Sequence, residues 1–153
     1  MRLEDVLIRD SIIESLLGTE KREVIEEMVA GLCSEVSGLN KDELLEVLLE
    51  REKLGSTGIG YGVAIPHGKM AGLDKILVSF ARSKNGLDFQ ATDEKPVHLF
   101  FLIVAPDNST ASHLKVLSDI SRILKESEFR GKLLDAGNRD DIYRIIIEAD
   151  RAL

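Results

Sequence analysis

The apolar run from Leu99 to Ala105 constrains the fold of this chain more than any other segment. It carries no charged side chain, yet it is too short to cross a bilayer, which takes about 20 residues in a helix. A run of this length that ends at a proline, here Pro106, is typical of a buried β-strand. Amphipathic helices that flank such a strand cover its apolar faces, which indicates a layered α/β architecture.

Two helices are predicted ahead of this strand. Apolar residues recur at helical spacing after Thr19, which is a candidate N-cap. A second apolar stripe follows Asn40, and the segment Asn40–Glu43 resembles a capping box. We expect this second helix to end near Lys53, because Gly55 follows it.

Helical spacing returns after the buried strand. From Ser112 onward one helical face carries four apolar residues, namely Leu114, Leu117, Ile120 and Leu124. Two shorter helices are predicted over residues 128–135 and 139–149, and Asn138 is a plausible cap for the second of them. The chain therefore carries helices on both sides of its strands in sequence.

The middle third of the chain has a different character. Residues 55–62 contain four glycines, which favours an irregular backbone over a regular element. Val63–Ile65 is predicted as a short strand, and Ile76–Ala81 as a longer one. The dipeptide Asn85-Gly86 is a turn signal that should bound the second of these strands.

Length and composition favour one globular domain. The chain has 153 residues, 44% of them hydrophobic and 31% charged, so that two separate cores would each be cramped. We therefore predict a single α/β domain over residues 1–153, with a mixed central β-sheet flanked by helices on both faces. Hydrophobic periodicity alone does not separate a mixed sheet from a fully parallel one.

Charge and cysteine content indicate which classes of partner and which cellular compartment to expect. A formal net charge of −7 argues against nucleic acid, whose phosphates bind Lys and Arg, and fits a neutral or basic protein partner better. Cys33 is the only cysteine, so that no intrachain disulfide forms and a reducing compartment is favoured. The first residues carry no signal-peptide pattern and no segment is a membrane span, which favours a cytoplasmic location.

The glycine-rich run that ends at His67 carries the most chemical information. Glycines allow the backbone to approach a ligand and to present N–H groups to it. Pro66 restricts Ile65 to extended conformations and stiffens the approach to His67. Gly68 is expected to leave room beside the imidazole for a bulky group. The pattern indicates a histidine that is presented rather than buried.

Familiar nucleotide loops do not fit this run. Gly60 and Gly62 are not followed by a third glycine at Rossmann spacing, because position 65 is isoleucine. Gly68-Lys69 is followed by Met70, so that the hydroxyl that binds magnesium in a Walker loop is missing. Neither nucleotide motif is supported.

The chain has three histidines, and each has a structural interpretation. Taken alone, His67 would be a structural histidine at a strand end. His98 begins the apolar strand and is assigned to a solvated strand end. His113 lies near the start of a predicted helix, at a loop–helix junction of the kind that binds anions. By itself His113 would be an exposed helix residue, whereas next to His67 it becomes a candidate second imidazole.

The segment Gly55–His67 resembles the active-site signature of enzyme IIA of the phosphoenolpyruvate-dependent sugar phosphotransferase system. The subtype is the fructose/mannitol type, which includes nitrogen-regulatory members. Arg51-Glu52, Pro106 and the segment Ser112–Ser118 match as well, and the resemblance extends over most of the chain. Tyr61 departs from the pattern, because a small polar residue, usually asparagine, is common there.

The resemblance implies roles for individual residues. Nε2 of His67 would accept a phosphoryl group from the phosphocarrier HPr and pass it to a cysteine of enzyme IIB, or hold it as a regulatory mark. Arg51 would be the local cation, and His113 would lie close to His67 or its phosphate. Ser56 and Thr57 would donate hydroxyls to the phosphoryl oxygens or merely cap the turn. A backbone carbonyl would fix the tautomer of His67, and no cofactor or metal is implied.

The alternatives differ in how they use His67. A sugar-uptake carrier would hand the group to enzyme IIB, whereas a regulatory protein of the nitrogen type would bind targets according to its phosphorylation state. A metal site would combine His67 and His113 with Asp107 or Asp119, although no closely spaced ligand motif is present. A purely structural interaction module would leave the glycine-rich Pro-His run unexplained. Cys33 lies in a helical pattern, so that we expect neither a fused enzyme IIB nor a membrane component IIC.

Overall fold

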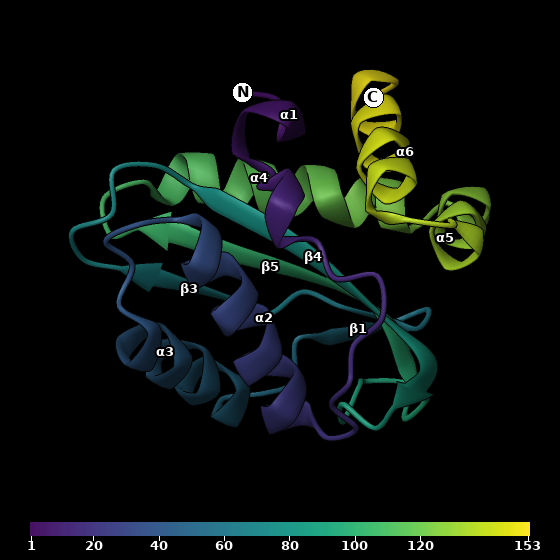
Figure 1. Cartoon of the computed structure of the whole chain (residues 1–153), viewed down its shortest axis with the longest axis horizontal. Helices are drawn as coiled ribbons and strands as arrows, with labels where there is room; N and C mark the ends of the chain where they lie inside the picture. The colour runs from purple at the N-terminus through teal and green to yellow at the C-terminus, as the bar shows by residue number, and fades with distance from the viewer.

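Strand β5 (Val97–Pro106) is the centre of a five-stranded sheet in the computed structural model, which describes residues 1–153 (Figure 1). The other elements, in chain order, are α1 (Leu3–Val6), the 3₁₀ turn η1 (Arg9–Ser11), α2 (Lys21–Glu35), α3 (Lys41–Lys53), β1 (Gly58–Gly60), β2 (Val63–Ala64), β3 (His67–Met70), β4 (Leu77–Leu87), α4 (Thr110–Leu124), α5 (Ser127–Asp135) and α6 (Arg139–Arg151). No helix combines the length and the apolar composition that crossing a membrane requires.

The pairing of the strands makes the sheet mixed. β4 pairs with β5 in antiparallel fashion along one edge, whereas β2 and then β3 pair with the other edge in parallel. β1 completes the sheet by pairing antiparallel to β2. Pro66 separates β2 from β3, because it has no N–H to donate to a ladder. The register sets His67 opposite Ile103 of β5.

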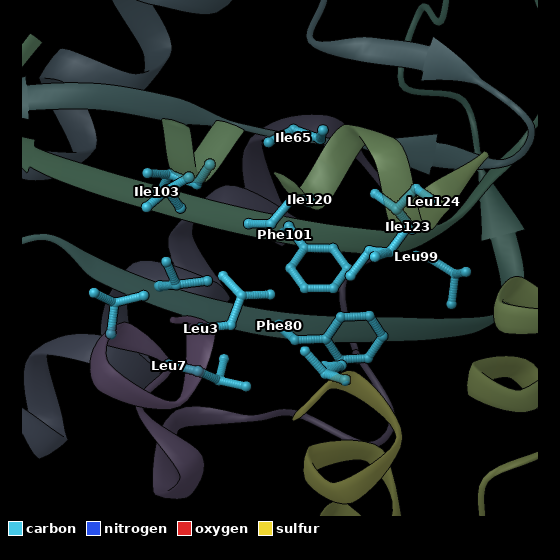
Figure 2. Packing of buried hydrophobic residues seen from close by; sticks show 14 of the residues in the cluster. Leu3, Leu7, Ile65, Phe80, Leu99, Phe101, Ile103, Ile120, Ile123 and Leu124 are labelled. Atoms are coloured by element: carbon cyan, nitrogen blue, oxygen red, sulfur yellow. The ribbon is translucent and has the colours of Figure 1, made fainter. Parts of the chain in front are cut away.

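The buried run in β5 alternates between two hydrophobic cores. Phe100, Leu102 and Val104 pack on the side of α2 and α3. Leu99, Phe101 and Ile103 face the opposite side, where α4, α5 and α6 cover the sheet (Figures 1 and 2). Each buried large apolar side chain stabilises the fold by about 1.5–3 kcal/mol. The predicted mixed sheet with helices on both faces is confirmed.

Helix caps follow the prediction at two of three positions. Asn40 accepts a hydrogen bond from the N–H of Glu43 at 2.9 Å, and Asn138 accepts one from Asp141 at 2.9 Å. Thr19 was the wrong cap for α2. Glu20 is the N-cap, because the Glu23 carboxylate reaches back to the Glu20 N–H at 3.1 Å.

The buried face of α4 differs from the predicted one. Leu114 was expected to share the apolar face, but it is 59% exposed. The helix begins at Thr110, and its buried stripe is His113, Val116, Ile120, Ile123 and Leu124. Leu114 lies outside this stripe because the stripe, spaced at three and four residues, starts one position earlier. A histidine therefore opens the face that packs on the sheet.

Two local features of the strands also differ from expectation. Asn85-Gly86 does not bound a strand but lies inside β4, where the register with β5 shifts between Arg82 and Leu87. Gly86 has φ +73°, so that the irregularity uses a left-handed backbone rather than a hairpin turn. Gly58–Gly60 forms the short strand β1, although its glycines favoured an irregular backbone.

Candidate active site

His67 is the first residue of β3, and one hydrogen bond fixes its tautomer. Its Nδ1 lies 2.8 Å from the carbonyl oxygen of Ile65. Because a carbonyl can only accept, Nδ1 carries the proton and the lone pair is left on Nε2. The N–H of Ile103 bonds the Pro66 oxygen at 3.0 Å and anchors the turn between β2 and β3. The imidazole is half-buried.

His113 lies beside His67, although the two residues come from different elements. Their ring centroids are 5.6 Å apart, and the rings are inclined at 71°. His113 is 7% exposed, and its Nε2 is buried without a hydrogen-bond partner. Burial lowers the pKa of His113, and electrostatic interaction with His67 and Lys69 lowers it further. The imidazole is therefore held neutral and retains an unused hydrogen-bonding atom.

Gly68 allows α3 to pack against β3 and does not provide space beside the His67 imidazole. We expected it to leave room beside the imidazole, but a Cβ at this position would lie 2.7 Å from Cγ1 of Val47. Real Cβ contacts are longer than this, so that any side chain would push α3 away from β3. That expectation was wrong, because β-strand alternation directs position 68 toward α3. The glycine allows the helix that carries Arg51 to lie close to the strand that carries His67.

Arg51 lies in the last turn of α3 and is held by the loop that follows it. Its Nη1 donates to the carbonyl of Gly55 at 2.8 Å. It forms no ion pair with a carboxylate. A solvent-accessible guanidinium without a counter-ion suits an incoming anion.

The hydroxyls of Ser56 and Thr57 bond within the chain. Ser56 Oγ donates to the Phe89 carbonyl at 2.8 Å and accepts from the Gly58 N–H at 3.0 Å. Thr57 is 3% exposed, and its hydroxyl donates to the carboxylate of Glu52. Of the two roles predicted for these hydroxyls, the bonds match the one that stabilises the turn.

Glu52 was part of the Arg51-Glu52 match to the family, but the sequence did not predict a role for it. Its carboxylate is buried and pairs with Lys21 Nζ at 2.7 Å. A glutamate near the end of an amphipathic helix has no pattern that distinguishes it from a solvated one. Its place in the Arg51-Glu52 match was the available signal.

The remaining candidates lie apart from the two imidazoles or have other partners. His98 bonds the Ser83 carbonyl through Nδ1 at 3.1 Å, in keeping with its structural assignment. Asp119 pairs with Lys115 at 2.6 Å, and no group of three or more His, Cys, Asp or Glu side chains is arranged to hold a metal ion. Tyr61 has φ +59°, a conformation that asparagine adopts more readily, and Arg130 lies over its ring at 4.8 Å.

The structure is a mixed sheet between two helical layers, with His67 at the start of β3 and a second imidazole, that of His113, beside it. Residues 6–149 match the family described as "Phosphoenolpyruvate-dependent sugar phosphotransferase system, EIIA 2". The chain belongs to this family, as the motif around His67 predicted.

Relatives of the chain fall into two groups. A nitrogen regulatory protein of Bradyrhizobium diazoefficiens is 40% identical over 146 residues, which cover 95% of both chains. The fructose-specific EIIABC component of Bacillus subtilis is 37% identical over 151 residues, but the match spans only 24% of that longer protein.

Solved structures show the same fold. Nitrogen regulatory protein IIA-Ntr from Neisseria meningitidis superposes with a TM-score of 0.88 at 35% identity, over 94% of this chain and 98% of that one. IIA mannitol from Escherichia coli superposes with a TM-score of 0.73 over 90% of this chain and 96% of that one, at 22% identity.

Proposed function

We propose that residues 1–153 act as one phosphoryl-carrier domain that accepts its group on Nε2 of His67 from an HPr-type phosphocarrier. The observation that carries this proposal is the bond from Nδ1 to the Ile65 carbonyl, which leaves the Nε2 lone pair free. A nucleophile must present such a lone pair before the reaction starts. The half-buried ring is reachable by a partner, and no side chain of this protein must move a proton first.

In the transfer step, the Nε2 lone pair attacks the phosphorus of the donor's phosphohistidine. The new bond joins His67 Nε2 to phosphorus, while the P–N bond of the donor breaks and its electron pair stays on the donor nitrogen. Positive charge develops on the His67 ring, and the Ile65 carbonyl that accepts from Nδ1 stabilises it. Transfer to the next acceptor reverses these roles.

His113 and Arg51 supply the stabilisation of the phosphoryl oxygens. The buried Nε2 of His113 has no partner within the chain, so that as an N–H it can donate to an oxygen of the phosphoryl group on His67. Donors in a site shielded from water stabilise charge more strongly than solvated ones. The guanidinium of Arg51, oriented by Gly55, adds positive charge without a competing carboxylate. Ser56 and Thr57 hold the loop that places these groups.

Two roles for the phosphorylated chain remain candidates, and both are cytoplasmic. Passing the group to a cysteine of enzyme IIB would serve sugar uptake, and mannitol IIA of Escherichia coli has been determined in complex with its phosphorylated enzyme IIB. Holding the group as a mark that controls binding to target proteins would serve regulation. The match to nitrogen regulatory proteins over nearly their whole length supports the regulatory role.

Phosphorylation with purified components tests the proposal. Phosphoenolpyruvate, enzyme I and HPr should label the chain with one acid-labile phosphoryl group, and His67→Ala should take up none. Full labelling of His67→Ala would overturn the assignment. The labelled protein would then be offered to enzyme IIB proteins and to candidate regulatory targets. Loss of label to a IIB cysteine indicates transport, whereas binding that depends on the label indicates regulation.

A further inference from the structure

Glu52 is buried against the loop that leads to His67. Its side chain is 5% exposed and pairs with Lys21 Nζ, whose own side chain is 19% exposed. Taking a carboxylate out of water is unfavourable unless the charge is paired and hydrogen-bonded. Glu52 meets both conditions, because it also accepts bonds from the N–H of Thr57 at 3.1 Å and from its hydroxyl.

A continuous series of hydrogen bonds leads from this carboxylate to the imidazole. Thr57 donates two hydrogen bonds to Glu52, and its own carbonyl accepts a bond from the Ile65 N–H at 3.0 Å. The carbonyl of Ile65 in turn accepts the Nδ1 proton of His67 at 2.8 Å. The Lys21–Glu52 pair therefore joins the start of α2 and the end of α3 to the nitrogen opposite the reactive one.

We propose that Glu52 is a positioning residue for His67: through Thr57 and Ile65 it fixes the peptide carbonyl that keeps the proton on Nδ1 and the lone pair on Nε2. The role in phosphoryl transfer rests on the proposed function of His67, whereas the effect on the tautomer does not. Outer partners of this kind set the tautomer of functional histidines elsewhere by orienting the group that accepts the ring proton.

A purely structural role for Glu52 predicts a different outcome from a positioning role. If the carboxylate only joins α2 to α3, its removal lowers the melting temperature and leaves the imidazole unchanged. If it positions His67, its removal lets the Ile65 peptide reorient, and the ring populates both neutral tautomers. Nitrogen-15 NMR of the histidine side chains distinguishes the tautomers directly, in the unphosphorylated protein.

Two variants and one matched control make the test. Glu52→Ala removes both acceptor oxygens, whereas Glu52→Gln keeps the shape and one acceptor and removes the charge. Glu50→Ala is the control, because Glu50 lies in the same helix and pairs with Lys53 at 2.8 Å on the exposed surface. Each protein is measured well below its own melting temperature.

In the wild type and in Glu50→Ala we expect His67 to be the Nδ1–H tautomer throughout. Glu52→Ala should show a mixture of tautomers and Glu52→Gln a smaller admixture. The single-turnover rate from phospho-HPr should fall by about 10- to 100-fold in Glu52→Ala, while one phosphoryl group per chain is still taken up. A wild-type tautomer together with a wild-type rate in Glu52→Ala would overturn the proposal, even with a lowered melting temperature.

The two proposals can fail separately. If the wild-type chain takes up no phosphoryl group, the carrier function is wrong, and the NMR comparison still decides whether Glu52 positions the ring. If Glu52→Ala does not fold, Glu52→Gln decides: an unshifted tautomer with an unchanged rate, where transfer occurs, overturns the positioning role, and a shifted tautomer supports it.

Discussion

His67 and His98 make the same hydrogen bond and yet have different surroundings. Each is half-buried, and each has Nδ1 bonded to a backbone carbonyl, that of Ile65 at 2.8 Å and that of Ser83 at 3.1 Å. Only His67 has a second imidazole beside it, with a buried nitrogen that lacks a partner. A fixed tautomer is therefore not sufficient for a site, and the second imidazole beside His67 makes the difference.

The largest expected effect separates the two histidines directly. His67→Ala should abolish labelling by phospho-HPr, because Nε2 of His67 is the proposed nucleophile. His98→Ala should be labelled to the wild-type extent. Acid-labile phosphate per chain, measured at completion, checks both. Loss of labelling in a folded His98→Ala protein would break the comparison.

Removing the second imidazole should have a smaller but clear effect. His113→Ala should still accept one phosphoryl group, and its transfer rate should fall by about 100-fold, as for the loss of one donor to a charged transition state. Rapid-quench measurement of a single turnover checks the rate. An unchanged rate would mean that the unpartnered nitrogen of His113 takes no part in transfer.

Glycines beside the two histidines should respond differently to alanine. Gly68→Ala should destabilise the fold by about 1–3 kcal/mol, because its Cβ would meet Val47. Gly86→Ala should also destabilise it, since Gly86 combines φ +73° with contact to the His98 ring. Urea unfolding measures both.

Val47→Ala makes this test more specific, because it should reduce the loss of stability in Gly68→Ala but not in Gly86→Ala. A smaller loss for Gly68→Ala in the Val47→Ala background shows that packing against α3 is the cause. The loss for Gly86→Ala should be the same in both backgrounds, because its strain lies in its own backbone and in His98. Equal losses for Gly68→Ala in the two backgrounds would contradict the packing explanation.

The smallest expected effect is a pH dependence of stability that originates at His113. Its pKa is lowered by burial, while a histidine in the unfolded chain titrates near 6.5. Below about pH 6.5 the unfolded chain thus binds a proton that the folded chain resists, and stability falls as the pH decreases. The melting temperature should drop less between pH 7.5 and 5.5 in His113→Gln than in the wild type.

Much of the fold was predictable because it depends on local patterns. The apolar run in β5 identified a strand covered on both sides, and Asn40 and Asn138 cap their helices as their side chains predicted. Errors arose where contacts in the folded protein selected a neighbour of the residue that propensity favours. Glu20 replaced Thr19 as a cap, and the buried stripe of α4 begins at His113 instead of Leu114.

The sequence by itself determined the reactive candidate. A proline before His67 and a glycine after it form a local pattern that needs no distant contact to be recognised. It also determined the sheet core, because an uncharged apolar strand can be accommodated only between two covering layers.

The resemblance implied that His113 lies close to His67, and the structure confirms it, but only the tertiary structure decided how the surroundings of His67 are buried and paired. His113 reaches it because β5 runs alongside β3 and ends where α4 begins. Glu52 is paired in the interior because the start of α2 lies against the end of α3 and brings Lys21 to it. These contacts join segments that are far apart in the chain. An unpartnered imidazole nitrogen and a paired carboxylate are informative only when they are buried, and they become buried only after the two cores have formed.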